Sequence, residues 1–247
     1  MLRRRLLLGV VASAAVLGPP SMPAHAGSFA ISPIRLDLST TTRSAALKVR
    51  NDAQQALVQA EIVLWEQVDG EDRLTATRDL VVSPAVFTLA ENGSQLVRVA
   101  LRGAPAEPAR ELSYRLILQE VPQSANPDFS GLQVALRLSV PVFVAQAGTT
   151  GPALTWTAEA GDGDVLVKAQ NSGDAHARVL GFTIEPADGG ATLAQPVATY
   201  ILPGQTHSWR LREEGNGAGP AADWRRLRLK VTTDDGDSET ELDTSVR

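Results

Sequence analysis

The side chains that most often carry out catalysis are scarce in this chain. Its 247 residues include no cysteine and three histidines, and only His176 and His207 follow the leader described below. Without cysteine, thiolate zinc sites and cysteine nucleophiles are excluded. Metal sites need three or four convergent ligands, so we expect both histidines to be solvated. The acidic cluster of Asp234, Asp235 and Asp237 does not have the spacing of a calcium loop. The sequence does not suggest an enzyme, a metal or a cofactor.

The most informative pattern is a run of alternating aliphatic side chains. Its apolar members are Leu132, Val134, Leu136, Leu138, Val140, Val142 and Val144. This alternation predicts one strand over residues 132–144, about 43 Å long at roughly 3.3 Å per residue and longer than most strands. Pro141 cannot donate a ladder hydrogen bond, which places at least its end of the strand at an edge. Two interpretations stay open: the apolar face lines the protein's own core, or it is added to a partner's sheet.

The first 26 residues have the form of a secretory signal peptide. Arg3, Arg4 and Arg5 precede a short apolar run, and Ala24-His25-Ala26 is a small-x-small cleavage signal. The run is too short to span a bilayer, although an uncleaved anchor is the alternative. Cleavage after Ala26 leaves 20 basic and 28 acidic residues, a net charge of −8. This balance does not favour nucleic-acid binding. We expect an exported protein without stable membrane insertion.

Strand patterns dominate the rest of the chain and indicate an all-β fold. Alternating segments are separated by turn residues such as Asp69-Gly70 and Asn92-Gly93. The length suits two sandwiches of about 100 residues each. The flexible stretch 147–152 suggests a boundary, so we expect one immunoglobulin-like domain over residues 27–147 and a second β-sandwich over 148–247. The acidic segment 234–243 is interpreted as a tail.

Several motifs, in this order and spacing, resemble one family. They are ISPIRLDL at 31–38, LKVRN at 47–51, IVLW at 62–65, VSPAVFTL at 82–89, NG at 92–93, QLVRV at 95–99, YRLILQEVP at 114–122 and LQVAL at 132–136. Together they resemble the periplasmic chaperones of chaperone–usher pilus assembly (PapD-like) over most of residues 27–146. The resemblance implies two sandwiches arranged as a boomerang in the periplasm of a Gram-negative bacterium. It also implies pilin subunits and an outer-membrane usher as partners.

The resemblance implies a mechanism of donor-strand complementation. A pilin lacks its last strand, and the chaperone lends alternate side chains of a long strand to the open groove. By resemblance the donor residues are Leu132, Val134, Leu136 and Leu138. Free chaperone could also self-associate through this strand.

The resemblance also assigns charged residues. Arg35 resembles the cleft arginine that anchors the subunit's C-terminal carboxylate, and an ion pair with Asp37 is the alternative reading. The lysine that usually precedes an apolar-aromatic pair on the donor strand is missing, as in non-classical branches of the family. Arg137 and Arg115 are candidates for the second anchor.

A further charged group resembles the cluster that the family places between its domains. Arg98, Glu120 and Asp223 are its expected members, with ordinary surface ion pairs as the alternative. Two rival functions also remain. A secreted glycoside hydrolase or carbohydrate-binding sandwich would need paired carboxylates or exposed aromatics, and aromatics are only 4% of the chain. A structural pilus or adhesion subunit would need an N-terminal donor extension, for which residues 27–34 leave little room.

Overall fold

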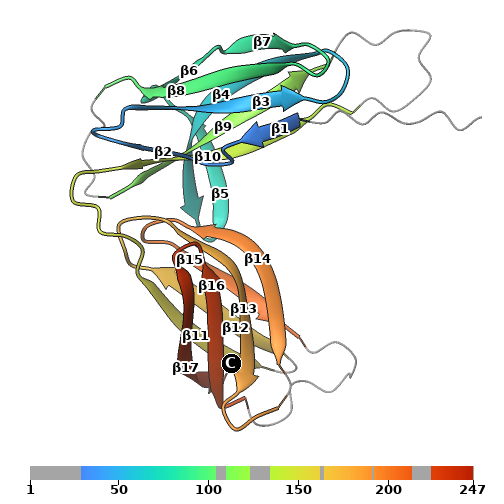
Figure 1. Ribbon diagram of the computed structural model, residues 1–247. Coiled ribbons are helices and arrows are strands. Elements are labelled where there is room, and N and C mark those ends of the chain that lie inside the picture. The colour runs from blue at the N-terminus through green and yellow to red at the C-terminus, as the bar shows by residue number, and fades with distance from the viewer. Residues whose placement is uncertain are drawn as a thin grey trace, which may run out of the picture.

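The all-β expectation is confirmed. The computed structural model describes residues 29–103, 110–122, 134–161, 164–190, 192–212 and 224–246, and in these ranges the chain forms strands and no helix. None of these residues forms a helix that could cross a membrane. The predicted leader lies outside the described residues. Figure 1 shows two bodies set at an angle, the first built from β1 to β10 and the second from β11 to β17.

Two sheets form the first domain. One has the order β1 (Phe29–Ser32), β3 (Ser44–Asn51), β8 (Ser94–Leu101), β6 (Leu80–Ser83). The other has the order β2 (Leu36–Ser39), β10 (Arg137–Ala145), β9 (Leu112–Val121), β4 (Ala56–Val68), β5 (Glu71–Ala76), with β7 (Val86–Leu89) also pairing β4. The chain therefore passes from one sheet to the other between β1 and β2.

Alternation along the strands explains the core of this domain. On β3, Leu47 and Val49 are buried while Lys48 between them is exposed, and β8 alternates in the same way. This period of two is what a half-buried strand requires. The predicted Asp69-Gly70 turn joins β4 to β5, with φ values of 54° and 83°. Asp and Gly tolerate positive φ, which matches the twist of a two-residue hairpin turn.

The second domain is a β-sandwich whose two groups of strands share one strand, so that its seven strands form one continuous path. Its order is β14 (Leu193–Ile201), β13 (Ala177–Pro186), β16 (Arg226–Thr233), β17 (Gly236–Val246), β11 (Leu154–Gly161), β12 (Asp164–Asn171), β15 (Thr206–Leu211). Trp156 stacks on Trp209 and packs against Phe182 within its core. The interpretation of the acidic segment as a tail was wrong. It forms β17, because Glu239 and Asp243 lie opposite the basic side chains of β16 and pair with them.

The linker between the domains is tied down by one carboxylate. Asp174 accepts hydrogen bonds from the backbone nitrogens of Thr150 and Gly151 at 2.8–3.0 Å, and these bonds lower its pKa. Its own carbonyl accepts a hydrogen bond from the backbone nitrogen of Glu111 in the first domain, at 2.8 Å. A Cβ on Gly173 would lie 2.4 Å from the carbonyl oxygen of Gly151, so only glycine fits there. The loop around Asp174 thus contacts both the linker and the first domain.

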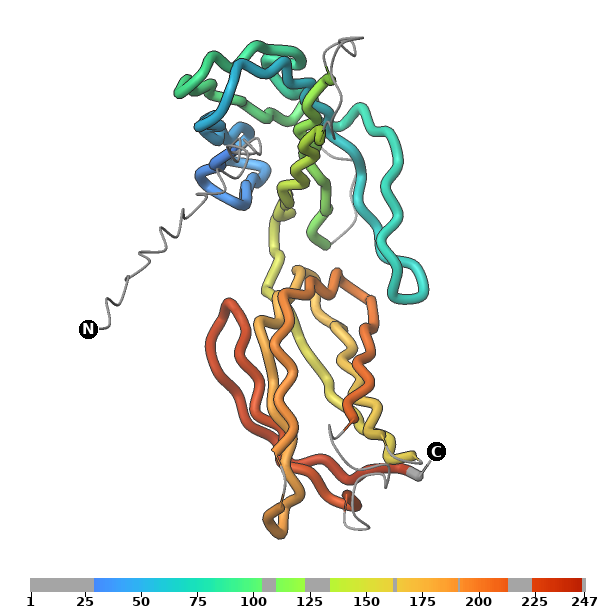
Figure 2. The backbone as a smooth tube through the Cα atoms, turned by 90° about the vertical axis from the view of Figure 1, so that its right-hand side faces the viewer, coloured from blue at the N-terminus to red at the C-terminus, as the bar shows by residue number. Residues whose placement is uncertain are grey.

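The hairpin of β4 and β5 also reaches the second domain (Figure 2). The side-chain amide of Gln67 donates to the carbonyl of Tyr200 at 2.9 Å, and its oxygen accepts from the nitrogen of Leu202 at 3.0 Å. The Gln67 side chain of β4 thus donates one hydrogen bond to the backbone at the end of β14 and accepts another, as a neighbouring strand would. The two domains are therefore joined by contacts well beyond the linker.

Candidate functional site

The apolar run of residues 132–144 is divided between the protein's own core and its surface. Val144, Val142 and Val140 are at most 3% exposed and lie in the core of the first domain. Leu138 is only partly buried against that core, and Val134 is 62% exposed. The interpretation that this face lines the protein's own core therefore holds for Val140, Val142 and Val144, and addition of the other half to a partner's sheet stays a prediction. The strand itself is shorter than expected: β10 begins at Arg137, and Leu132 lies outside the described residues.

No strand of the described residues pairs with the other side of β10 before Val142. β9 pairs with β10 from Arg137 to Val144, but β2 joins the other side only from Val142 onward. The expectation that the Pro141 end lies at the edge was therefore wrong, because β2 covers that end. Among the described residues the open edge is the part of β10 before Pro141. The proline, which has no N–H, lies next to Val142, where the pairing with β2 begins.

The ladder shows which backbone groups this edge presents. The nitrogen of Glu120 donates to the carbonyl of Leu136 at 2.8 Å, which makes this a hydrogen-bonded pair. In an antiparallel ladder such pairs alternate with pairs whose N–H and C=O groups point the other way. Arg137 and Ser139 therefore direct their backbone groups away from β9, along the stretch of β10 that β2 does not reach. An added strand could bind there.

Further apolar side chains lie where the chain passes from one sheet to the other. Phe29 and Ile31 of β1 are only partly buried against the core, like Leu138. Ile34, between β1 and β2, is 65% exposed. β1 and β2 are end strands of the two sheets, so these residues lie at the side of the sandwich where the chain changes sheets. An extended partner segment could bury them together with Val134 and Leu136.

Arg35 lies between the two domains. Its Nε donates to Asp37 Oδ2 at 3.1 Å, and its Nη1 donates to Asp234 Oδ2 of the second domain at 2.9 Å. Burial lowers the pKa of the guanidinium, but the two carboxylates outweigh burial and raise it. The ion pair with Asp37 expected as the alternative is present, and a second ion pair joins Arg35 to the other domain.

An aromatic cluster fills the interface beside Arg35. It consists of Trp65, Phe143, His176, Tyr200 and Leu202. The imidazole of His176 stacks on Phe143 with ring centroids 3.5 Å apart, and its Nδ1 lies 2.7 Å from Glu111 Oε1. The expectation that His176 is solvated was therefore wrong, because its side chain is only 13% exposed.

The remaining predicted charges lie in separate places. Arg115 lies under this cluster, its guanidinium carbon 3.6 Å from the centre of the Trp65 ring. Arg137 is exposed on β10. Arg98 is exposed on β8 in the four-stranded sheet, and Glu120 accepts a hydrogen bond from the nitrogen of Leu136 within the first domain. Asp223 lies outside the described residues.

The side-chain contacts of acidic and basic residues described between the domains come from other residues. They are the ion pair of Arg35 with Asp234 and the contact of the Glu111 carboxylate with the His176 imidazole. Sequence reasoning missed Arg178, Tyr200 and the role of Asp234. One signal was available for Tyr200, since the chain has only two tyrosines.

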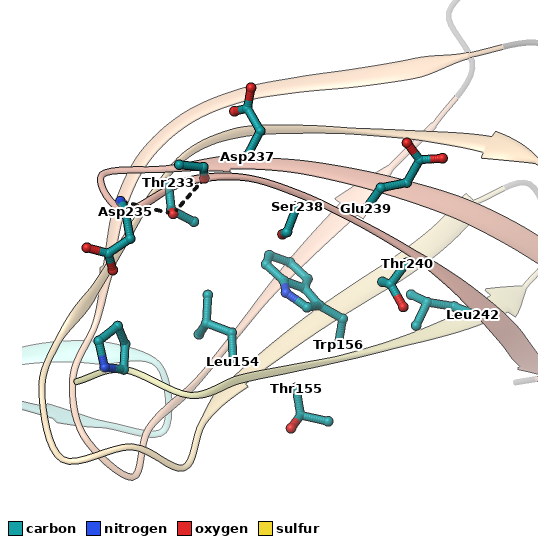
Figure 3. A pocket seen from close by; sticks show the side chains of 12 residues that line it. Leu154, Thr155, Trp156, Thr233, Asp235, Asp237, Ser238, Glu239, Thr240 and Leu242 are labelled. Carbon is teal, nitrogen blue, oxygen red and sulfur yellow. Dashed lines mark hydrogen bonds between the residues drawn. The ribbon is translucent and has the colours of Figure 1, made fainter. Parts of the chain in front are cut away.

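A groove of about 560 Å³ lies in the second domain, where β11 and β17 diverge (Figure 3). Leu154 and Trp156 line it, while the carboxylates of Asp237 and Glu239 point away from Trp156. The groove thus has no pair of carboxylates facing each other across it, as a glycoside hydrolase would need. Among the described residues no group of three or more histidines, aspartates or glutamates could hold a metal ion.

Comparison with known families identifies the first domain. Residues 28–149 match the family described as pili and flagellar-assembly chaperone, PapD N-terminal domain. The chain belongs to this chaperone family. Its members are assembly chaperones, which confirms the expectation that the chain is not an enzyme. A comparison with curated protein sequences gave no match.

Solved structures of chaperones share the fold of both domains. A chain of the CsuC–CsuE chaperone–tip adhesion subunit complex, from the archaic chaperone–usher Csu pili of Acinetobacter baumannii, is 18% identical with a TM-score of 0.62. The match covers 89% of this chain and 99% of that one. The YadV chaperone is 19% identical with a TM-score of 0.63, over 87% of this chain and 99% of its own. A chain of the complex of SafA pilin with the SafB chaperone, from Salmonella enterica, is 17% identical with a TM-score of 0.60, over 89% and 97%. At these identities the matches establish the two-domain β-sandwich fold of this pilus chaperone.

Proposed function

We propose that this chaperone captures incomplete pilin subunits by adding its β10 edge to their open sheet. The observation that carries the proposal is the change in burial along the alternating apolar run, from Val134 to Val144. The valines at 144 and 142 are 0% exposed, while Val134 on the same face is 62% exposed. A protein that used the whole face for its own core would bury all of it. An exposed apolar strand edge is an aggregation hazard unless a partner covers it.

Capture would combine backbone pairing with apolar burial. Arg137 and Ser139 offer unpaired backbone groups to an added strand, and Val134, Leu136 and Leu138 offer side chains to its groove. Full burial of one such side chain contributes about 1.5–3 kcal/mol, before the costs of ordering. Leu132 would continue the series beyond the described residues. No nucleotide is needed, because burial drives the reaction.

Arg35 would orient the captured subunit by holding its C-terminal carboxylate. Its planar guanidinium can pair with both oxygens of a carboxylate, and its side chain is 35% exposed where it contacts the second domain. We place this activity in the periplasm, after export by the predicted leader, with delivery of the subunit to an outer-membrane usher. The names of the structural neighbours support this proposal, since two of them are chaperone complexes with a pilin or a tip subunit.

The test is capture of the cognate pilin on co-expression. Val134→Asp combined with Leu136→Asp should abolish recovery of the pilin in a pull-down, without lowering the melting temperature of the free chaperone. A matched control is Val86→Asp combined with Leu96→Asp, which changes two exposed apolar residues (56% and 52%) away from the edge. The control should capture pilin normally. Undiminished capture by the first variant would refute the proposal.

A further inference from the structure

We infer that the subunit's carboxylate is held between two arginines, one from each domain, and that Asp234 occupies this seat in the free chaperone. The arginines are Arg35 of the first domain and Arg178 of the second. The inference rests on the proposed function and names the second cation that the sequence lacks at the usual lysine position. It also adds an internal competitor for the same site.

The carboxylate of Asp234 already lies between the two arginines. Asp234 Oδ2 accepts from Arg35 Nη1 at 2.9 Å, and Asp234 Oδ1 lies 3.6 Å from Arg178 Nη1. The two oxygens of a single carboxylate thus face two guanidinium groups. The side chains of Arg35, Arg178 and Asp234 are 35%, 25% and 28% exposed, so solvent reaches all three. A carboxylate from outside could take the same position.

Arg178 is held in place by a ring and retains unused donor capacity. Its guanidinium carbon lies 5.3 Å from the centre of the Tyr200 ring, within the range of a cation–π contact. Its Nε is buried without a hydrogen-bond partner among the described residues. A buried donor without a partner is costly, so a ligand that satisfied it would gain affinity. Tyr200 itself is fixed by Trp65 and by the backbone contact with Gln67.

The two arginines that the sequence suggested as the second anchor, Arg115 and Arg137, are less suited to it than Arg178. The guanidinium of Arg115 stacks on Trp65 at 3.6 Å, and its nearest carboxylate is Asp72 at 3.8 Å. Burial lowers the pKa of Arg115, and Asp72 only partly offsets this. Arg137 is exposed on β10, and its side chain makes no hydrogen bond or ion pair among the described residues. Within the part of the chain that the structure describes, only Arg178 shares a carboxylate with Arg35.

Binding of the subunit's carboxylate is coupled to the contact between the domains, because the Asp234 carboxylate occupies the same position. Asp234 follows β16, and its pair with Arg35 joins residues 199 positions apart in the sequence. An incoming carboxylate must displace Asp234, because both cannot lie between the same two guanidinium groups. Capture would then replace an intramolecular ion pair with an intermolecular one. The affinity for the subunit's carboxylate is therefore weaker than the two arginines alone would give.

The experiment uses two synthetic peptides with the sequence of the cognate pilin's last strand, one ending in a carboxylate and one in an amide. Calorimetry should show that the full chaperone prefers the carboxylate form by at least about tenfold. Arg178→Gln should remove most of this preference. Asp234→Asn should increase the affinity for the carboxylate peptide several-fold and leave that for the amide peptide unchanged. Arg50→Gln, an equal change of charge at an exposed pair with Asp52, should have no effect.

The outcomes separate this inference from the proposed function. If Arg178→Gln and Asp234→Asn both leave the preference unchanged while the Val134→Asp and Leu136→Asp double variant still loses the pilin, the inference fails and the function stands. If the double variant still captures pilin, the function itself fails. Asp234→Asn keeps the test decisive should Arg178→Gln fold poorly, because it removes the competitor and no cation.

Discussion

Two valines of the same alternating apolar run should respond to the same substitution in opposite ways. Val134 and Val142 have the same side-chain type and the same parity, but they are 62% and 0% exposed. Substitution by alanine removes two methyl-sized groups, worth about 1.6 kcal/mol when fully buried. The exposed share at Val134 can be buried only by a partner. Val134→Ala should therefore weaken pilin binding by about 1 kcal/mol, which is about fivefold in Kd.

The effects on stability should be reversed. Val134→Ala should change the free energy of unfolding of the free chaperone by no more than about 0.5 kcal/mol. Val142→Ala leaves a cavity in the core, and the lost transfer free energy plus the cavity should cost about 2–3 kcal/mol. Urea unfolding measures the stability of each variant, and calorimetric titration with the pilin subunit measures its binding. Equal losses of stability in both variants would refute the division of this face between core and partner.

Three further predictions concern the contact between the domains. Gly173→Ala should lower the free energy of unfolding by about 1–3 kcal/mol in urea, because the new Cβ would meet the linker carbonyl of Gly151 at 2.4 Å; a variant as stable as wild type would contradict this. Trp65→Ala should cost about 3–5 kcal/mol and separate the melting of the two domains in calorimetry, since Trp65 is 2% exposed; one unshifted transition would refute the role of the aromatic cluster. The backbone hydrogen bonds to Asp174 lower its pKa, so its stabilising effect is complete above about pH 3.9 and is lost as the pH falls through the lower folded-state pKa. The stability difference between wild type and Asp174→Asn should therefore shrink in that acidic range, and a difference independent of pH would count against it.

Local patterns allowed the strands to be predicted, and one turn in detail. The alternation on β3 and β8 gave their buried faces, and Asp69-Gly70 gave the turn between β4 and β5. The extent of β10 could not be predicted. Whether the edge of β10 before Pro141 is covered depends on where β2 begins, and β2 lies about 100 residues earlier in the chain. Periodicity reports which face is apolar, but not what covers it.

The charged part of the site depends on pairings across the whole chain. Arg35 was found through its motif, but its partner Asp234 lies in a segment that looked like a solvated tail. Nothing local to Arg178 distinguishes it from other arginines on strands. Its position over Tyr200 follows from the register of β13 and β14, which places the two residues opposite each other and which local sequence patterns do not encode. The stack of His176 on Phe143 depends on the docking of the two domains, which explains why His176 was expected to be solvated.

We propose that one alternating apolar run serves the chaperone's core at one end and a partner's sheet at the other. Because the chain has no cysteine, a single thiol can test this directly. In Val134→Cys, maleimide should label the thiol rapidly in the free chaperone and at least about tenfold more slowly in the pilin complex, since the complex would bury the side chain at position 134. In Val142→Cys the thiol should be unreactive in both states. Labelling of the Val134→Cys variant at the same rate with and without bound pilin would contradict the claim.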